Sequence, residues 1–515
     1  MRASVQPLGV TAIKSARTIV CMDENKAMPI AAWNTTATTR YPQLQQSLDL
    51  DVAIIGGGIT ALTAALQLAR AGKRVAVLEL LTVGAGSTGD STGHLTACLD
   101  LSYAELSARV GEDWARLVAQ SSMAAIDFIE RTIAELNIDC DFARVPGFRF
   151  SQSAAGAADL KREAVLTRAL GLETSYSSVA PLAATGVLRF EHQAQFDAPR
   201  YCQALAAALP QYGAAVYGDT LVESVVDGDP CVIHAAGQVV TAHAVIMATH
   251  LPLNRVLTLQ DQLKPYTTYT LAFQLGDLNF PEGLFWDTEE PYHYIRRVTD
   301  KDRQLLLVGG ADHPTGQSRD TDKSFEMLET YARKTLPVLS VEYRGSGQIF
   351  VAADGLPYIG ELPGMTNVQV ATGFAGTGLT FGTVAGMLMA DIVLDRPNAW
   401  RMLYRPSRAK HIASLHVDSV HLESVSVPIG EGRLVEVDEE IVAMYRDQDG
   451  LLHMFSAACT HMGCTVQWNN AAQSWDCPCH GGRYRPTGEV LCAPPTQALK
   501  SWSPQATIQL ERRLA

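Results

Sequence analysis

The sequence has little positive charge, few cysteines for its length and no uninterrupted apolar run. Lysine and arginine number 41 against 54 acidic residues, a formal net charge of −13, which argues against nucleic acid or an anionic membrane as the main partner. Ten cysteines in 515 residues are too few for a disulfide scaffold. Its length of 515 residues predicts about three compact units, or one large domain and a small one. With 47% hydrophobic and 18% charged residues, the chain is expected to be neither disordered nor fibrous.

The sequence also lacks an export signal and a clear membrane span. Residues 1–27 carry scattered basic side chains but no apolar stretch long enough for secretion. We predict that they are a disordered leader, or an artefact of start-codon choice, and that the protein is cytoplasmic. The longest uncharged run, 362–390, contains six glycines and two polar amides, so we expect a buried loop and helix with no membrane span.

A nucleotide-binding unit is present near the N-terminus. Residues 51–55 form a short apolar run typical of a buried parallel strand, and three glycines, 56–58, end it. Helical spacing follows from Ile59 until Gly72, and 74–79 is the next predicted strand. Strand, glycine turn, helix and strand within about 30 residues are typical of a dinucleotide-binding fold.

Each position in this unit has a physical reason. Gly56 permits the tight turn, Gly58 lets the backbone approach a pyrophosphate, and Ala61 lets the helix lie close to the strand. The helix N-terminus offers free N–H groups to phosphate. Glu79 ends the second strand, where a carboxylate accepts ribose hydroxyls. These residues leave open whether the dinucleotide is NAD or FAD.

Further segments resemble the D-amino-acid oxidase-like family of FAD-dependent oxidoreductases over about residues 45–395. They are Gly86-Ser-Thr-Gly-Asp-Ser-Thr-Gly93, the strand around Val222, Ala248-Thr249-His250, and 354–360 leading to 371–382. The resemblance implies FAD, bound also by Gly86, Ser87, Thr88, Ser91, Thr92, Val222, Gly376, Gly378, Leu379 and Thr380. The chain departs from the family at His250, where glycine is more usual.

A substrate-binding sheet is predicted between the two flavin segments. Residues 268–275 alternate as in a strand, and 292–297 with 304–310 read as an antiparallel hairpin. Alternation places Tyr292, Tyr294 and Arg296 on one face. In the family this sheet covers the flavin and often supplies an arginine for a substrate carboxylate, so we predict that Arg296 binds substrate and that Tyr294 and Tyr269 line the site. The alternative is a solvated arginine beside core tyrosines.

A basic, proline-bearing stretch from 394 to 410 marks a domain boundary, and a small all-β domain is predicted beyond it. This region contains Cys459-Thr-His461 and Cys477-Pro-Cys479-His480. One cysteine and one histidine on each arm suit a two-iron cluster, in which Cys459 and Cys477 bind one iron and His461 and His480 the other. A structural zinc site is the alternative. The motif resembles a Rieske [2Fe-2S] domain over residues 425–515.

The resemblance is to Rieske proteins of the cytochrome bc type, and it implies a disulfide between Cys464 and Cys479. Those proteins have a serine two residues after the last histidine ligand and a tyrosine two further on, where this chain has Gly482 and Tyr484. A missing hydrogen bond to the cluster predicts a lower reduction potential. The other cysteines, Cys492 included, are interpreted as ordinary buried thiols.

We therefore predict an α/β FAD-binding, Rossmann-like domain with an antiparallel-sheet substrate domain, plus a small all-β Rieske domain. The flavoprotein is expected over residues 28–410, a linker over 411–424 and the cluster domain over 425–515. The leading hypothesis is a dehydrogenase of a small amine or amino acid that passes electrons from FAD through the cluster to an external acceptor. The alternatives are hydroxy-acid oxidation, electron flow from an external donor into the flavin, and a non-catalytic electron-transfer or redox-sensing protein.

Overall fold

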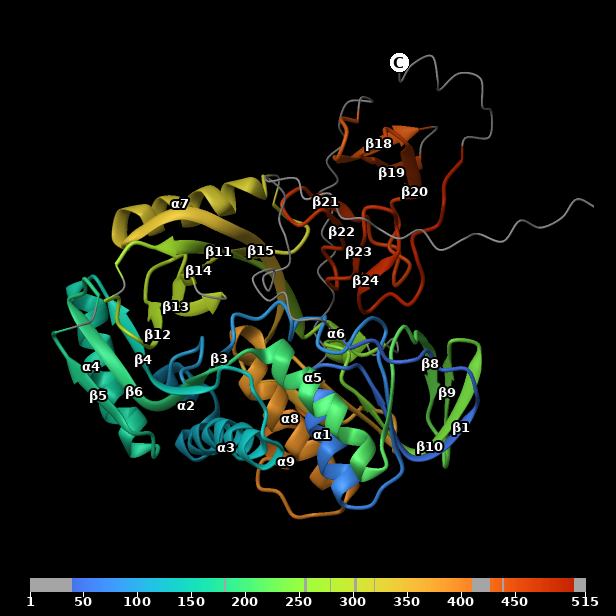
Figure 1. The fold of residues 1–515 in the computed structure, drawn as a ribbon, viewed down its shortest axis with the longest axis horizontal. Coiled ribbons are helices and arrows are strands. Elements are labelled where there is room, and N and C mark those ends of the chain that lie inside the picture. The colour runs from blue at the N-terminus through green and yellow to red at the C-terminus, as the bar shows by residue number, and fades with distance from the viewer. Residues whose placement is uncertain are drawn as a thin grey trace, which may run out of the picture.

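The computed structural model describes residues 39–179, 182–253, 257–277, 279–300, 303–318, 320–409, 427–437 and 440–503. The predicted leader, 1–27, and the predicted linker, 411–424, lie outside the described residues. Figure 1 shows two flavoprotein lobes with the C-terminal domain resting against both.

The first lobe is built on a mixed sheet that carries the glycine turn. Its strand order is β16 (Tyr358–Glu361), β17 (Val368–Thr372), β10 (Gln238–Met247), β1 (Leu48–Ile55), β2 (Val75–Leu78) and β7 (Ala215–Tyr217). The four strands from β10 to β7 and their neighbour β17 run parallel, whereas β16 is antiparallel to β17. β8 (Val222–Val226) and β9 (Cys231–Ala235) continue antiparallel from β10. This is the Rossmann-like core that the motif predicts.

Helices pack against this sheet and against one another. They are α1 (Ile59–Arg70), α2 (Tyr103–Val110), α3 (Glu112–Leu136), α5 (Ala198–Ala208), η1 (Leu209–Tyr212), η2 (Ala375–Thr377), α8 (Gly378–Val393), α9 (Arg401–Tyr404) and η3 (Pro406–Arg408). α1 and α8 approach closely, because a Cβ on Gly386 would lie 2.6 Å from the Thr63 Cβ. Within the described residues, Ala375–Val393 alone is long and apolar enough to cross a bilayer, and 67% of that window is buried inside the protein. The uncharged run is thus a core helix, as expected.

The second lobe is a large, mainly antiparallel sheet. Its order is β15 (Val338–Ala352), β11 (Leu263–Leu275), β14 (Arg303–Pro314), β13 (His293–Asp300), β12 (Leu284–Asp287), β4 (Ala143–Ser151), β6 (Gly186–Gln195) and β3 (His94–Leu95), with β5 (Thr174–Ser177) beside β6. The predicted hairpin is β13–β14. α7 (Asp322–Thr335) covers β11, β14 and β15, α4 (Ala154–Ala169) packs on β4 and β6, and the short α6 (Leu257–Gln260) precedes β11.

The C-terminal domain consists of two small antiparallel sheets. One contains β18 (Gly432–Val437), β19 (Glu440–Arg446) and β20 (Leu452–Ser456), and the other β21 (Gln467–Asn469), β22 (Ser474–Asp476), β23 (Arg483–Tyr484) and β24 (Val490–Cys492). Trp475 and Tyr484 are fully buried in its core. In Figure 1 the β21–β24 sheet faces the flavoprotein lobes and β18–β20 lies farther out.

Hydrogen bonds hold this domain against the second lobe. The Asn470 Nδ2 donates to the Asp322 Oδ2 over 2.8 Å, and the Ala471 amide donates to the Thr321 Oγ1 over 3.0 Å. Both acceptors lie at the start of α7. The C-terminal domain is therefore docked on the flavoprotein.

Candidate functional site

One cavity of about 570 Å³ extends from the glycine turn to the second sheet and the C-terminal domain. Its volume lies in the usual range for a ligand site. Of the predicted FAD-binding residues, the following line the cavity: Gly56, Gly58, Glu79, Gly86, Ser87, Thr88, Ser91, Thr92, Val222, Gly376, Gly378 and Leu379. Two others lie outside the lining. Ala61 is buried in α1, and the Thr380 Oγ1 accepts a hydrogen bond from the Thr96 amide over 3.0 Å.

The glycine turn is sterically required. Gly56 has φ +106°, and a Cβ there would lie 2.5 Å from the Ala248 carbonyl oxygen. A Cβ on Gly58 would lie 2.8 Å from the Thr88 Oγ1. α1 begins after Gly58 with no cap from that residue and no acidic side chain in its first turn. Its N-terminus therefore offers N–H groups and a positive dipole end to a pyrophosphate, which fits FAD.

Glu79 closes the other end of this turn. Burial raises the pKa of its carboxyl group, and the Leu81 amide donates to the Oε1 over 2.8 Å. The segment from Thr220 to Val222 lines the cavity beside it. The position suits the acceptance of ribose hydroxyls, which is the role expected from the sequence.

The loop from Gly86 to Gly93 covers the cavity and is held by His250. The Ser87 Oγ and the His250 Nδ1 are 2.6 Å apart, and the His250 ring packs edge-on against Phe350 at 4.6 Å. His250 has φ +67°, the left-handed conformation that favours glycine. Burial lowers the pKa of His250 to about 4, so its imidazole is neutral. His250 therefore adopts the backbone conformation that favours glycine, and its side chain also contacts Ser87 in the loop from Gly86 to Gly93.

The substrate end of the cavity is aromatic. Tyr294, which the sequence proposes for the substrate site, lines it together with Trp286 and Tyr292. The Tyr294 hydroxyl lies 3.0 Å from the Thr270 Oγ1. His94 also lines this end, and burial lowers its pKa to about 3. His94 is therefore uncharged at neutral pH and adds no positive charge to this end of the cavity.

The prediction that Arg296 contacts substrate is wrong for this cavity. Arg296 is 6% exposed and lies outside the lining, and its Nη1 donates to the Gly93 carbonyl over 3.1 Å. Alternation along β13 gave the correct face, but Arg296 lies farther along the strand, beneath the loop that ends at Gly93. It supports the flavin-covering loop from behind.

Tyr269 also lies away from the cavity. Its hydroxyl is 2.8 Å from the His313 Nε2, and its ring packs edge-on against Phe325 of α7. Thr268, one residue earlier on β11, lines the cavity. Successive residues of a strand point to opposite faces, and the face with Tyr269 is the one that α7 covers.

Arg149 of β4 is a cavity residue that the sequence reasoning missed. Its two terminal nitrogens donate to the carbonyls of Leu99 and Asp100, over 3.3 and 3.4 Å. The signal in the sequence is Phe148-Arg149-Phe150, because the two phenylalanines bury on one face and turn the arginine to the other. Its guanidinium is the group suited to a substrate carboxylate.

Acidic groups lie at or near the same end of the cavity. Asp100 lines the cavity and accepts the Gly376 amide over 2.7 Å, and burial raises its pKa. The Tyr292 hydroxyl donates to the Asp312 Oδ2 over 3.0 Å, and burial raises the pKa of Asp312 to about 6. Glu290 also lines the cavity. The substrate end thus carries more acidic than basic groups.

The four predicted cluster ligands lie together in the C-terminal domain. The thiols of Cys459 and Cys477 are within hydrogen-bonding reach, and Cys477 lowers the pKa of Cys459 to about 6 while the same contact raises that of Cys477. The rings of His461 and His480 are 5.0 Å apart and nearly perpendicular. The His480 Nδ1 is buried and has no hydrogen-bond partner. Two thiols, two imidazoles and an open ring nitrogen fit a Rieske [2Fe-2S] cluster.

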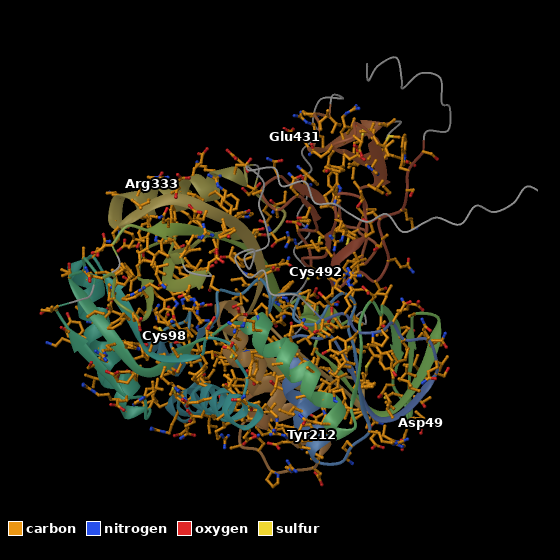
Figure 2. The ribbon with its side chains drawn as sticks, in the orientation of Figure 1. Asp49, Cys98, Tyr212, Arg333, Glu431 and Cys492 are labelled. Atoms are coloured by element: carbon orange, nitrogen blue, oxygen red, sulfur yellow. A yellow bond between two sulfur atoms is a disulfide. The ribbon has the colours of Figure 1, made fainter. Side chains whose placement is uncertain are left out.

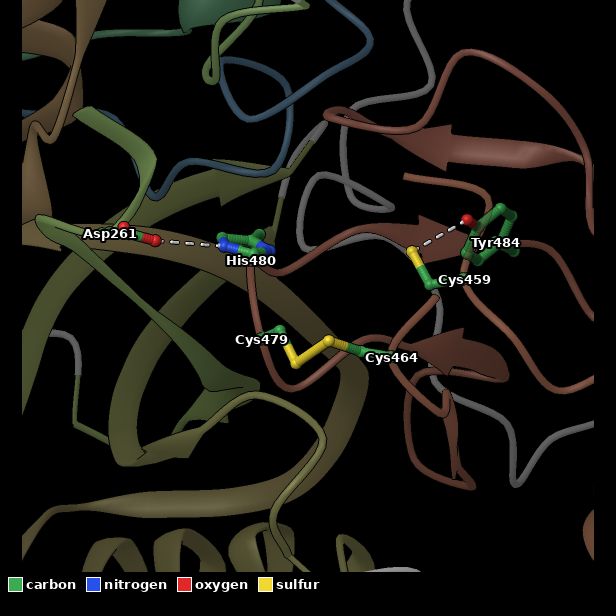
Figure 3. The surroundings of a disulfide bond; sticks show 6 residues. All are labelled: Asp261, Cys459, Cys464, Cys479, His480 and Tyr484. Atoms are coloured by element: carbon green, nitrogen blue, oxygen red, sulfur yellow. Dashed lines mark hydrogen bonds and ion pairs between the residues drawn. A yellow bond between two sulfur atoms is a disulfide. The ribbon is translucent and has the colours of Figure 1, made fainter. Parts of the chain in front are cut away.

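A disulfide joins the two cluster loops. Cys464 and Cys479 are bonded, with their Cα atoms 6.5 Å apart (Figure 3). This is the bond that the resemblance to the bc type implies. The Cys477 sulfur lies within 4.8 Å of both disulfide sulfurs. Because the disulfide occupies two of these three cysteines, they do not form a separate metal site.

Tyr484 and Gly482 lie beside Cys459, one of the predicted cluster ligands. The Tyr484 hydroxyl is 3.1 Å from the Cys459 Sγ and accepts the Thr460 amide over 2.9 Å (Figure 3). A Cβ on Gly482 would lie 3.6 Å from the Cys459 Sγ and only 2.8 Å from the Pro495 Cδ. The glycine therefore makes room for a neighbouring loop as well as omitting a serine hydroxyl.

That neighbouring loop belongs to the wall of the flavin cavity. The C-terminal domain contributes these lining residues: Arg483, Val490, Leu491, Cys492, Ala493, Pro495 and Thr496. Figure 2 shows Cys492 where the C-terminal domain meets the flavoprotein. Desolvation raises the pKa of the Cys492 thiol to about 11. Cys492 was predicted to be an ordinary buried thiol, but its exposure is intermediate and it lies in the cavity wall.

Comparison with known proteins agrees with both halves of the chain. A family model described as FAD dependent oxidoreductase matches residues 51–392, and a Rieske [2Fe-2S] domain model matches 419–503. A Bacillus subtilis protein, YhfW, whose name describes a Rieske 2Fe-2S iron-sulfur protein, is 30% identical over 92% of this chain and 98% of its own. The gamma-glutamylputrescine oxidoreductase of Escherichia coli is 26% identical over 68% of this chain and 85% of its own. The crystal structure of glycine oxidase from Geobacillus kaustophilus matches 71% of this chain and 100% of its own, with a TM-score of 0.60 and 22% identity.

Proposed function

Because this chain belongs to the FAD-dependent oxidoreductase family and carries a C-terminal Rieske [2Fe-2S] domain, we propose that it is a dehydrogenase of a small amine or amino acid. Its electrons would leave through the cluster to an external acceptor. When bound, FAD accepts a hydride from a substrate, and a [2Fe-2S] centre carries single electrons. The remaining roles belong to side chains of the chain itself.

The observation that carries the proposal is the wall shared by the cavity and the cluster domain. Pro495, which lines the cavity, is the neighbour of Gly482, and Gly482 approaches the ligand Cys459. On the opposite side, Gln348 also lines the cavity, and its Nε2 donates to the carbonyl of Gly481 over 3.0 Å. Gly481 directly follows the ligand His480. Close packing of the two cofactor sites supports electron transfer within one chain.

The side chains at the substrate end favour a basic nitrogen over a hydroxyl as the oxidised group. Asp100 and Glu290 line the cavity and provide acceptors for an ammonium group. The aromatic rings of Tyr292 and Tyr294 line the same end of the cavity. The name of the Escherichia coli relative, gamma-glutamylputrescine oxidoreductase, also refers to an amine.

Arg149 extends the proposed substrate class to amino acids. Its guanidinium lines the same end of the cavity, and a planar fork of donors suits a carboxylate. An amino acid would place its carboxylate at Arg149 and its amino group toward Asp100. A simple amine would use the acidic groups alone.

Anaerobic mixing of the holoenzyme with a panel of amines, amino acids and hydroxy acids tests the proposal. We expect the flavin absorbance to bleach first and the EPR signal of the reduced cluster to appear afterwards. Bleaching by hydroxy acids alone would contradict the substrate class. A cluster that becomes reduced only by an external donor, before the flavin, would indicate reverse flow. If no compound bleaches the flavin, a non-catalytic electron-transfer or redox-sensing role is favoured.

A further inference from the structure

The ligand His480 turns one ring nitrogen toward the flavoprotein. Its Nε2 lies 3.5 Å from the Oδ1 of Asp261, and the two side chains are only 11% and 4% exposed. Asp261 follows α6 and precedes β11, so it belongs to the flavoprotein and not to the cluster domain (Figure 3). The His480 Nδ1 is buried without a hydrogen-bond partner. The ring is thus oriented with one nitrogen toward a carboxylate and the other available to iron.

The residue after His480 is held by the same lobe. Gly481 has φ +68°, and a Cβ there would lie 2.7 Å from the Pro265 Cβ and 2.8 Å from the Phe350 Cε1. Its carbonyl accepts the hydrogen bond from the Gln348 Nε2. These contacts come from β11 and β15 and fix the backbone that carries the histidine. The His480 ring therefore faces Asp261, and the backbone that carries this ring is held by Gln348, Pro265 and Phe350.

A histidine that binds a metal through Nδ1 carries its proton on Nε2. Carboxylates commonly accept this proton, which orients the ring and increases its basicity as a ligand. A negative charge near the cluster also disfavours the more negative reduced state, so it lowers the reduction potential. The charge effect requires the carboxylate of Asp261 and would be lost with an amide, whose carbonyl oxygen is also the weaker hydrogen-bond acceptor.

We propose that Asp261 is a positioning residue for the Rieske cluster, contributed by the flavoprotein: it accepts the Nε2 proton of His480, holds the Nδ1 toward iron and lowers the cluster potential. The cluster would then have its proper ligand geometry and potential only when the side of the site formed by His461 and His480, its histidine edge, is docked on the flavoprotein. The inference rests on the proposed function in one respect, because it assigns that edge to electron exchange with the flavin.

The test is the isosteric variant Asp261→Asn in the full-length holoprotein. We expect a higher midpoint potential in a chemical redox titration, altered histidine nitrogen couplings in pulsed EPR of the dithionite-reduced cluster, and a cluster lost about 10- to 100-fold more readily to a chelator. Asp261→Glu should restore part of each effect. None of these measurements uses a substrate, so they remain valid even if the proposed enzymatic function fails.

The matched control is Asp322→Asn. Asp322 also bonds the C-terminal domain, through Asn470, but it has no contact with the cluster ligands in the described structure. We expect this variant to keep the potential, the couplings and the cluster retention of the unmodified protein. An unchanged or lower potential in Asp261→Asn, or the same upward shift in Asp322→Asn, would overturn the proposal.

In a separate assay, the substrate that bleaches the flavin reports on internal electron transfer. We expect the cluster of Asp261→Asn to be reduced no more slowly than that of the unmodified protein, because a higher cluster potential increases the driving force for electron transfer from the flavin. If the unmodified protein bleaches but its cluster stays oxidised, the proposed function fails while the redox titration still decides the role of Asp261.

Discussion

At the scale of single residues, Arg149 is the side chain that we propose binds a substrate carboxylate. Replacing it with methionine removes a charged donor pair of the kind worth about 1.5–3 kcal/mol. We therefore expect Arg149→Met to raise the KM for an amino acid about 10- to 100-fold, with little effect on the amine that lacks only the carboxylate. Steady-state kinetics on the matched pair of substrates measure this. Equal losses for both compounds would remove Arg149 from carboxylate binding.

Gly482 provides a second test at this scale. A serine there adds a hydrogen-bond donor beside the cluster, and we expect Gly482→Ser to raise the midpoint potential, because such bonds stabilise the reduced state. The added Cβ would press on Pro495, only 2.8 Å away at its Cδ. The double variant Gly482→Ser, Pro495→Ala relieves this contact and should show the same rise. A potentiometric titration in which either variant falls or stays constant would contradict the argument.

Individual residues were predictable where their chemistry is local in the sequence. Cys459 and His461 lie two positions apart, so their shared role can be read without the fold. Arg296 and Tyr269 depended on long-range geometry. Alternation gives the face of a strand but neither the depth along it, which hides Arg296 beneath a loop, nor the identity of the covering element, which is α7 for Tyr269.

At the scale of elements, the loop from Gly86 to Gly93 is stabilised from behind by Arg296. The Arg296 Nη1 donates a hydrogen bond to the Gly93 carbonyl. Burial lowers the pKa of the guanidinium to about 10, and the nearby charge of Asp197 opposes this shift. We expect Arg296→Met to loosen this loop and to weaken FAD retention about tenfold, consistent with the loss of one charged hydrogen bond. Fluorescence of released FAD during dilution measures the change.

Arg297 supplies the matched control. It lies next to Arg296 on β13, and its Nη1 donates to the Phe280 carbonyl on the other side of the strand. Arg297→Met should therefore retain FAD like the unmodified protein. If both variants release FAD equally, the effect comes from β13 as a whole and not from the support of the loop.

Elements with a local signature matched their predictions. The strand, glycine turn and α1 follow from residues 51–72, and the β13–β14 hairpin follows from two alternating runs around a polar turn. The contacts at His250 did not follow, because this left-handed residue meets the distant Ser87 and Phe350 through its side chain. Contacts of this kind are invisible to propensity and spacing.

At the scale of the whole molecule, Asp90 and Arg483 face each other across the two domains. Burial raises the pKa of Asp90 from 3.8 to about 7, and Arg483 opposes the shift. A carboxyl with a raised folded-state pKa stabilises the fold fully below about 3.8, and this contribution is lost as the pH rises toward about 7. The Tm of the FAD-free protein should therefore fall as the pH rises over this range. We expect the fall to be smaller in Asp90→Asn, because the amide does not titrate.

Thermal unfolding of both proteins between pH 4 and pH 7 measures this difference, on the interval set by the two pKa values. The unmodified protein should lose more stability than Asp90→Asn over that interval. Parallel curves for the two proteins would show that Asp90 does not titrate in it.

The order of the two halves could be predicted from the motifs, but their docking could not. No sequence pattern predicts that Pro495 lines the cavity or that Asp261 lies beside His480. Docking depends on complementary surfaces formed by residues hundreds of positions apart. Each half is recognisable by its own ligands, whereas the interface between them has no motif.

The shared wall of the cavity has a consequence for biosynthesis. A ribosome completes the flavoprotein before it reaches the segment 483–496 that closes the cavity, with a delay of roughly several seconds at about 5–20 residues per second. During this interval FAD meets an open, unhindered site. Once the C-terminal domain has folded and received its iron, the segment 483–496 covers part of this site. We therefore expect flavin to be acquired first, so that cofactor loading follows the direction of translation.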